Sequence, residues 1–125
     1  MRQLTLPQLR EEIEAALATF EIPLGTYRFG NGSRGPALSV GDPPEGVTVT
    51  GLEVLIPATP EIDTIPTFAG AVTVDRYPVR AVAHDGQSLS PVWNALAQTF
   101  RGVDAPQVLQ ATDRYPDQMV ITITP

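Results

Sequence analysis

The chain of 125 residues carries a formal net charge of −6, and it contains eight arginines, no lysine and no cysteine. The lack of cysteine excludes disulfide frameworks, zinc sites built on thiolates and cysteine nucleophiles. The negative charge argues against binding to nucleic-acid phosphates, which depends on Lys and Arg side chains. No apolar run approaches the roughly 20 residues that cross a bilayer. The N-terminus lacks a signal-peptide pattern. We therefore expect one domain over residues 1–125, made in the cytoplasm and without a membrane partner.

The first predicted element is a helix from Leu6 to Phe20, with apolar residues recurring on one face. Thr5 is a favourable N-cap, and Gln8 stands where a capping box places Glu or Gln. Pro23 ends the segment. Two strands are predicted next, separated by a glycine-rich turn: Leu24–Phe29 and Ala37–Val40.

The segment Val47–Ile56 is predicted as a long strand whose apolar parity changes at Gly51, so we expect a β-bulge at that glycine. The segment Pro57–Gly70 contains three prolines and is predicted as a fourteen-residue loop without secondary structure. Val72–His84 is the next predicted strand. Because proline cannot donate to a ladder, we expect this strand to lie at an edge or to break at Pro78.

A second helix is predicted from Ser90 to Phe100, with Ser90 as N-cap and Pro91 at its first position. Trp93 and Phe100 are expected to anchor it in the core. Two strands joined by a turn close the chain: Gln107–Thr112 and Gln118–Thr124. This order predicts the α+β class, a mainly antiparallel sheet with two helices, at least one of them packed on the sheet, and a long proline-rich loop.

Chemically reactive patterns are scarce. His84 is the only side chain that titrates near neutral pH without perturbation, and a histidine before Asp85-Gly86 is more often a surface or packing residue than a base. The segment 30–35 is rich in glycine but lacks the lysine and the following helix of a phosphate-binding loop. No calcium-loop spacing occurs. We therefore expect no enzymatic activity, no catalytic residue, no cofactor and no metal site.

The segment Pro57–Gly70 is the unusual part of the sequence, because Ile62, Ile65 and Phe68 recur within it every three residues. One interpretation is a strap that folds back over the chain's own core. The other is an arm that places these three side chains in a neighbouring subunit, which makes them candidate interface residues. Pairing between strand edges offers a second route to assembly.

A helix leads into strands, a second helix follows, and a short hairpin closes the chain. The segments that carry this order are Leu6–Phe20, Val72–Tyr77 leading to His84–Gly86, Ser90–Phe100 and Asp113–Ile123. In this order the chain resembles the small tail-terminator, tail-completion and neck proteins of tailed bacteriophages and prophages. The resemblance covers most of the chain but contains no single diagnostic motif.

The resemblance implies a structural virion protein that forms a ring, commonly a hexamer, at the head–tail junction. Its partners would be further copies of itself and neighbouring tail-tube, sheath or neck proteins. DNA would only pass through the lumen, and the net charge of −6 is compatible with that. The alternative is a small non-viral adaptor or binding module of α+β fold. An enzyme using carboxylates alone is a third class, for which no paired motif is found.

Overall fold

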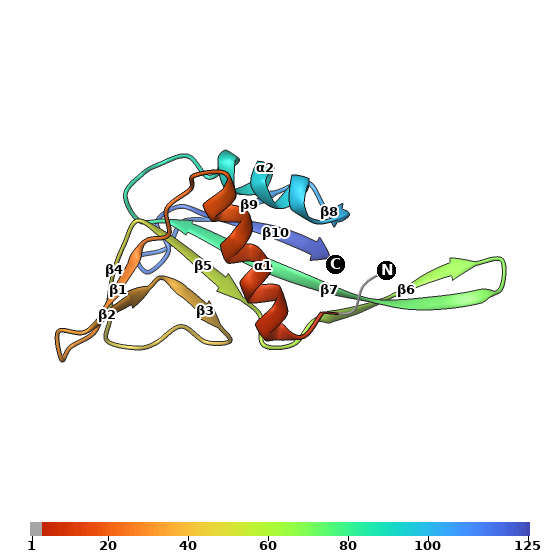
Figure 1. Ribbon diagram of the computed structural model, residues 1–125, viewed down its shortest axis with the longest axis horizontal. Helices are drawn as coiled ribbons and strands as arrows, with labels where there is room; N and C mark the ends of the chain where they lie inside the picture. Colours follow the sequence, from red (N-terminus) through yellow and green to blue (C-terminus); the bar gives the residue numbers. More distant parts are fainter. Residues whose placement is uncertain (1–3) are drawn as a thin grey trace.

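The computed structural model describes residues 4–125 and arranges them as a body from which one long hairpin projects (Figure 1). Two helices and mainly antiparallel strands confirm the α+β class. In chain order the elements are α1 (Leu6–Thr19), β1 (Thr26–Arg28), β2 (Arg34–Pro36), β3 (Leu38–Val40), β4 (Thr48–Thr50), β5 (Leu52–Ile56), β6 (Glu61–Thr67), β7 (Gly70–Ala83), α2 (Ser90–Thr99), β8 (Gly102–Val103), β9 (Gln107–Leu109) and β10 (Gln118–Thr124).

The strands form a small and a large sheet. The small sheet has the order β2-β1-β4, and all its pairs are antiparallel. The large sheet has the order β3-β5-β7-β10-β8, with β6 added to β7 and β9 added to β10. Only the pair β3–β5 is parallel. Strand β7 is central, because it pairs with β5, β6 and β10 along different parts of its length.

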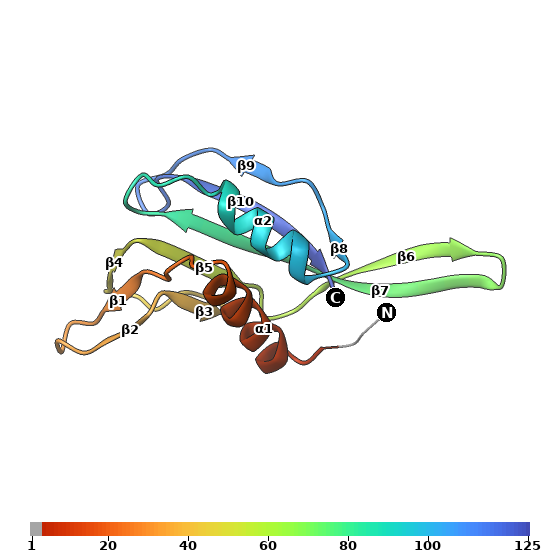
Figure 2. The ribbon, with the colours of Figure 1, turned by 45° about the horizontal axis from the view of Figure 1, so that its top comes forward.

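Both helices pack on one face of the large sheet (Figure 2), so the expected helix-on-sheet packing is confirmed. Helix α1 begins with the predicted capping box, in which Thr5 and Gln8 each bond the other's backbone N–H. Across the sheet, Val54, Ala81 and Met119 are register partners, and all three lie in the core with both helices. The alternation of a β-strand therefore directs one set of side chains into the helical core.

The opposite face of the sheet carries a second buried row. Glu53, Val82 and Gln118 are register partners one residue along from the core row. All three are buried, although two of them are polar. One row further, Leu55 and Arg80 are paired and point to this same face. The second face is thus covered by polar and charged side chains rather than by a helix.

Gly51 separates the predicted long strand into two strands, and it does not form the expected bulge. Strand β4 belongs to the small sheet and β5 to the large sheet, and Gly51 lies between them with a φ of 78°. Gly25 packs against it so closely that a Cβ on Gly25 would lie 1.9 Å from the carbonyl oxygen of Thr50. The parity change therefore marks a corner at which the chain leaves one sheet for the other, and the bulge prediction is wrong.

Strand β7 runs unbroken through Pro78, so the predicted break does not occur. On one side Pro78 faces Thr122 of β10. On the other side the β6 register ends at Arg76 and the β5 register begins at Arg80. Pro78 thus lies in the gap between two partner strands, where the strand has a local edge. Such a gap tolerates a residue that lacks an N–H donor.

Two further predictions need correction. The segment predicted as a loop without secondary structure contains strand β6 and the turn into β7, because its residues pair with the early part of β7. Ser90 does not cap α2, since Leu89 occupies the cap position and no side chain bonds to the helix start. The backbone N–H of Ser90 instead donates to the hydroxyl of Ser88.

Phe100 and Trp93 contribute unequally to the packing of α2. Phe100 is 3% exposed and belongs to the core, whereas Trp93 is only partly buried and donates its indole N–H to the carbonyl of Asp104. We predict that Phe100→Ala lowers the free energy of unfolding by about 3–5 kcal/mol. Trp93→Ala should cost distinctly less, because part of its ring already contacts solvent.

Denaturant unfolding of both variants measures the difference, with Asn94→Ala on the exposed side of α2 as the control. The control should lie within about 0.5 kcal/mol of the parent, as is usual for surface positions. A larger loss for Trp93→Ala than for Phe100→Ala contradicts this packing.

Candidate functional site

The most exposed feature of the protein is the hairpin formed by β6 and the first half of β7, residues 61–76, which we call the arm (Figure 2). Its seven cross-strand pairs run from Glu61↔Arg76 to Thr67↔Gly70. At about 3.3 Å per residue the arm extends roughly 20 Å. Phe68 and Ala69 form the turn, and Gly70 adopts a φ of 126° beside it.

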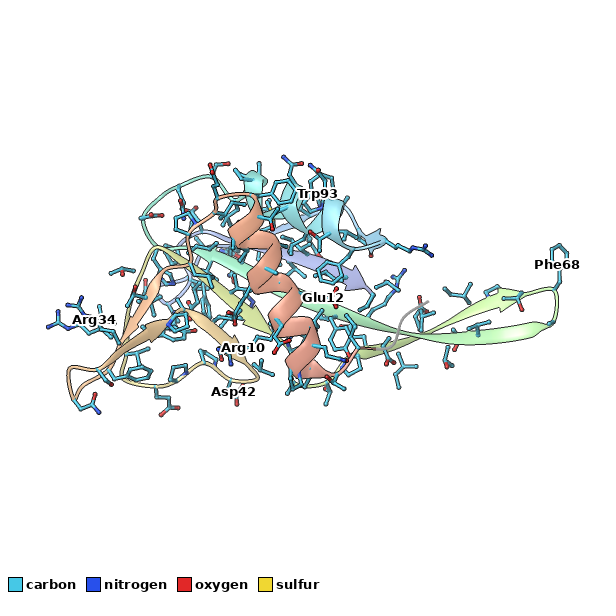
Figure 3. The ribbon with its side chains drawn as sticks, viewed as in Figure 1. Arg10, Glu12, Arg34, Asp42, Phe68 and Trp93 are labelled. Carbon is cyan, nitrogen blue, oxygen red and sulfur yellow. The ribbon has the colours of Figure 1, made fainter. Side chains whose placement is uncertain are left out.

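The arm separates the three side chains that the sequence predicted as interface residues. Ile62 faces Asp75, whereas Ile65 faces Val72 on the opposite side of the two-stranded ribbon. Phe68 lies at the tip, far from the body, and its ring projects to one side of the ribbon (Figure 3). A spacing of three therefore does not place these residues on one surface. Val72 joins Ile65, and the sequence analysis missed it because it expected no strand opposite.

Ile62, Ile65 and Phe68 are exposed by 73%, 39% and 114% of their reference areas. The interpretation of this segment as a strap over the chain's own core is therefore wrong. Ile65 and Val72 lie opposite each other and are both exposed, so one face of the ribbon carries an apolar patch of the kind that binds a partner. A two-stranded ribbon with no layer packed on it is marginally stable in water, so a partner would also stabilise the arm.

Arg76 makes one ion pair within the base of the arm and one with the body. The guanidinium of Arg76 lies 3.6 Å from the carboxylate of Asp63 on β6 and 3.5 Å from that of Asp104, which follows β8. Val74, on the ribbon face of Ile65, is 2% exposed. The base of the arm thus contacts the body through Arg76, whereas the outer part, from Thr64 to Thr73, is exposed along its whole length.

A second cluster lies inside the body around Glu53, whose side chain is completely buried. Arg114 donates two hydrogen bonds to its carboxylate, at 2.8 and 2.9 Å. The hydroxyl of Tyr27 donates to Oε2 at 2.6 Å, and Nε2 of His84 lies 2.8 Å from Oε1. We call these four residues the Glu53 cluster. It joins the small sheet, the large sheet and the segment before β10.

Electrostatics within the Glu53 cluster favour the ionised carboxylate. Burial alone would raise the pKa of Glu53, but the hydrogen bonds from Arg114, Tyr27 and His84 outweigh it and lower the pKa below its ordinary value of 4.5. Burial and the bond to the Glu53 carboxylate raise the pKa of Tyr27 well above its usual range. The hydrogen bonds to Glu53 likewise raise the pKa of Arg114.

The geometry of the Glu53 cluster is structural. Both carboxylate oxygens are occupied by protein donors, and no solvent reaches the side chain. His84 uses its Nε2 to bond the same carboxylate, which agrees with the prediction of a surface or packing residue. The sequence analysis missed Glu53 because it stands within the run Leu52–Ile56, where a buried acid has no local signal. Only its distant partners reveal it.

Other features of the described chain give no further chemistry. No group of three or more His, Asp or Glu side chains in residues 4–125 is arranged to hold a metal ion. No helix among these residues has the length and apolar character needed to span a membrane. Comparison with family models, with curated proteins and with solved structures finds no match to this chain.

Breaking the Glu53 cluster should destabilise the fold in a pH-dependent way. We predict that Arg114→Met costs about 2–3 kcal/mol at neutral pH, less than the ~3–5 kcal/mol of a fully buried pair because Arg114 is 37% exposed. Glu53 has a lowered pKa in the fold, so its contribution is complete above the unfolded pKa and is lost as the pH falls through the folded pKa. Removing Arg114 raises the folded pKa, so acid unfolding should begin at higher pH.

Unfolding curves recorded between pH 7 and pH 2 test this, with Arg10→Met as the matched control. Arg10 pairs with Glu14 on the surface, so its loss should cost only about 0–1 kcal/mol. Equal losses for the two variants, or an unchanged acid limb for Arg114→Met, would refute the role given to the Glu53 cluster.

Proposed function

We propose that the protein is a structural, ring-forming subunit of a tailed-phage virion that works at the head–tail junction as a tail terminator or neck protein. The observation that carries the proposal is the arm. Its apolar side chains are exposed outside the body, which suits contact with a protein surface rather than binding of a small substrate. Its partners are further copies of itself and neighbouring tail-tube, sheath or neck proteins. It is not an enzyme and carries no cofactor.

The charge and edges of the body support assembly. The net charge of −6 suits a ring whose lumen lets DNA pass without holding it. Within residues 4–125 the outer edges of β3 and β6 have no partner strand, and unpaired edges are templates for pairing between chains. Arms and edges together supply the two complementary surfaces that a head-to-tail ring requires.

The arm should be dispensable for folding and necessary for assembly. We predict that the parent forms a closed multiple of the 13.4 kDa chain, and that Ile62→Ser, Ile65→Ser and Phe68→Ser together shift it to the monomer. The fold should survive because all three side chains are exposed. Light scattering over a range of concentrations measures the mass, and circular dichroism checks the fold.

The matched control replaces Phe20, an exposed apolar residue at the end of α1 and away from the unpaired strand edges, with Ser. It should assemble as the parent does. A parent that remains monomeric at every concentration, alone and with tail extracts, would contradict the proposal and favour the small adaptor. If the arm variant assembles normally, the interface lies at the strand edges and not at the arm.

A further inference from the structure

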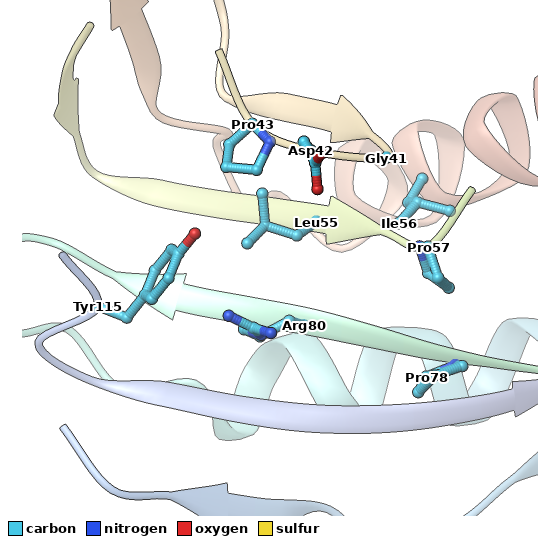
Figure 4. A pocket seen from close by; sticks show the side chains of 9 residues that line it. All are labelled: Gly41, Asp42, Pro43, Leu55, Ile56, Pro57, Pro78, Arg80 and Tyr115. Carbon is cyan, nitrogen blue, oxygen red and sulfur yellow. The ribbon is translucent and has the colours of Figure 1, made fainter. Parts of the chain in front are cut away.

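A pocket of about 210 Å³ opens beside the base of the arm, on the sheet face that the helices leave free (Figure 4). Its apolar wall combines Leu55 with three prolines, and Arg80 and Tyr115 close one side. The lining residues are Gly41, Asp42, Pro43, Leu55, Ile56, Pro57, Pro78, Arg80 and Tyr115. Small-molecule sites usually measure roughly 300–1,000 Å³. This volume suits one inserted side chain better than a free ligand.

Arg80 gives the pocket its chemical character. Its guanidinium lies 4.9 Å from the centre of the Tyr115 ring, and it forms no ion pair with any residue in 4–125. The other arginines that are only partly exposed, Arg10, Arg76 and Arg114, all have carboxylate partners. A half-buried cation that already contacts one aromatic ring, with proline walls around it, offers a favourable site for a second ring.

The chain carries a side chain that matches this pocket. Phe68 is the most exposed large apolar residue among those described, and it stands alone at the tip of the arm. No charged residue occurs between Asp63 and Asp75, so the outer arm brings no charge of its own into the pocket. Phe68 and the pocket lie at opposite ends of the arm and therefore do not meet within one molecule (Figure 3).

We propose that Phe68 of one copy inserts into the Arg80 pocket of a second copy. This rests on the self-association through the arm proposed above, and it adds the receiving surface. The phenyl ring packs against Leu55 and the prolines and presents its face or edge to the Arg80–Tyr115 pair. Because the tip of one arm reaches the base of the next, each subunit both gives and receives one contact.

A competing pocket of about 290 Å³ lies near the start of α2, between Ser88, Leu89 and the edge residue Val108. It is larger and lined by an exposed loop. It has no cation to attract an aromatic face, since its lining contains no arginine. The Arg80 pocket is therefore the preferred acceptor, and the α2 pocket is the outcome that the experiment must separate from it.

Disulfide trapping tests the contact directly, because the chain has no native cysteine. Purified Ala69→Cys protein, which keeps Phe68 and carries its thiol on the neighbouring turn residue, is mixed with Asp42→Cys protein, which places the second thiol in the lining of the Arg80 pocket. Parallel mixtures pair Ala69→Cys with Ser88→Cys in the α2 pocket and with Gln98→Cys on α2. A fourth mixture pairs Asp42→Cys with Ile62→Cys, which lies near the arm base, roughly 20 Å from the tip.

The proposal predicts that Ala69→Cys with Asp42→Cys gives a reducible cross-linked product at least tenfold faster than the other three mixtures. Preferential trapping at Ser88→Cys, or equal rates in all mixtures, overturns the assignment of the pocket. Assembly through the arm stands in that case if the parent still forms a multiple of the chain. A parent that stays monomeric, with no mixture cross-linked above the rate of random collision, overturns both proposals.

Discussion

Strand β7 is the constraint on which the rest of the structure depends. Its fourteen residues form the centre of the large sheet in their second half and one side of the arm in their first half. The same strand therefore connects the arm directly to the core. Pro78 marks the change of neighbours, and Arg76 holds the arm base to Asp63 and Asp104. The arm is consequently an extension of the core sheet.

The Glu53 cluster links the two sheets and the C-terminal part of the body that carries the arm. A completely buried acid is costly by itself, and the three donors around it make it a link between both sheets and the segment before β10. Arg114 also lies over the ring of Tyr115, which lines the Arg80 pocket. The cluster thus contacts the Tyr115 wall of the proposed acceptor site through Arg114.

Local patterns predicted much of this fold from the sequence. The α1 capping box and the strand Gln118–Thr124 needed only neighbouring residues for their prediction. Strand β6 was missed because Pro60 and Pro66 hide its pattern, and only pairing with β7 makes it a strand. Glu53 was missed for a similar reason, since its partners are distant in sequence. The Arg80 pocket likewise assembles from β5, β7 and three connecting segments, which no local pattern can show.

The central claim is that the arm is an assembly element whose outer part finds its packing partner in another molecule. Hydrogen exchange of backbone amides, compared between dilute monomer and concentrated assembly, tests it most directly. The account predicts that amides in 61–76 exchange rapidly in the monomer and become strongly protected on assembly. Amides of β10 should be protected in both states. Unchanged exchange in the arm, while the solution mass rises to a multiple, would contradict the account.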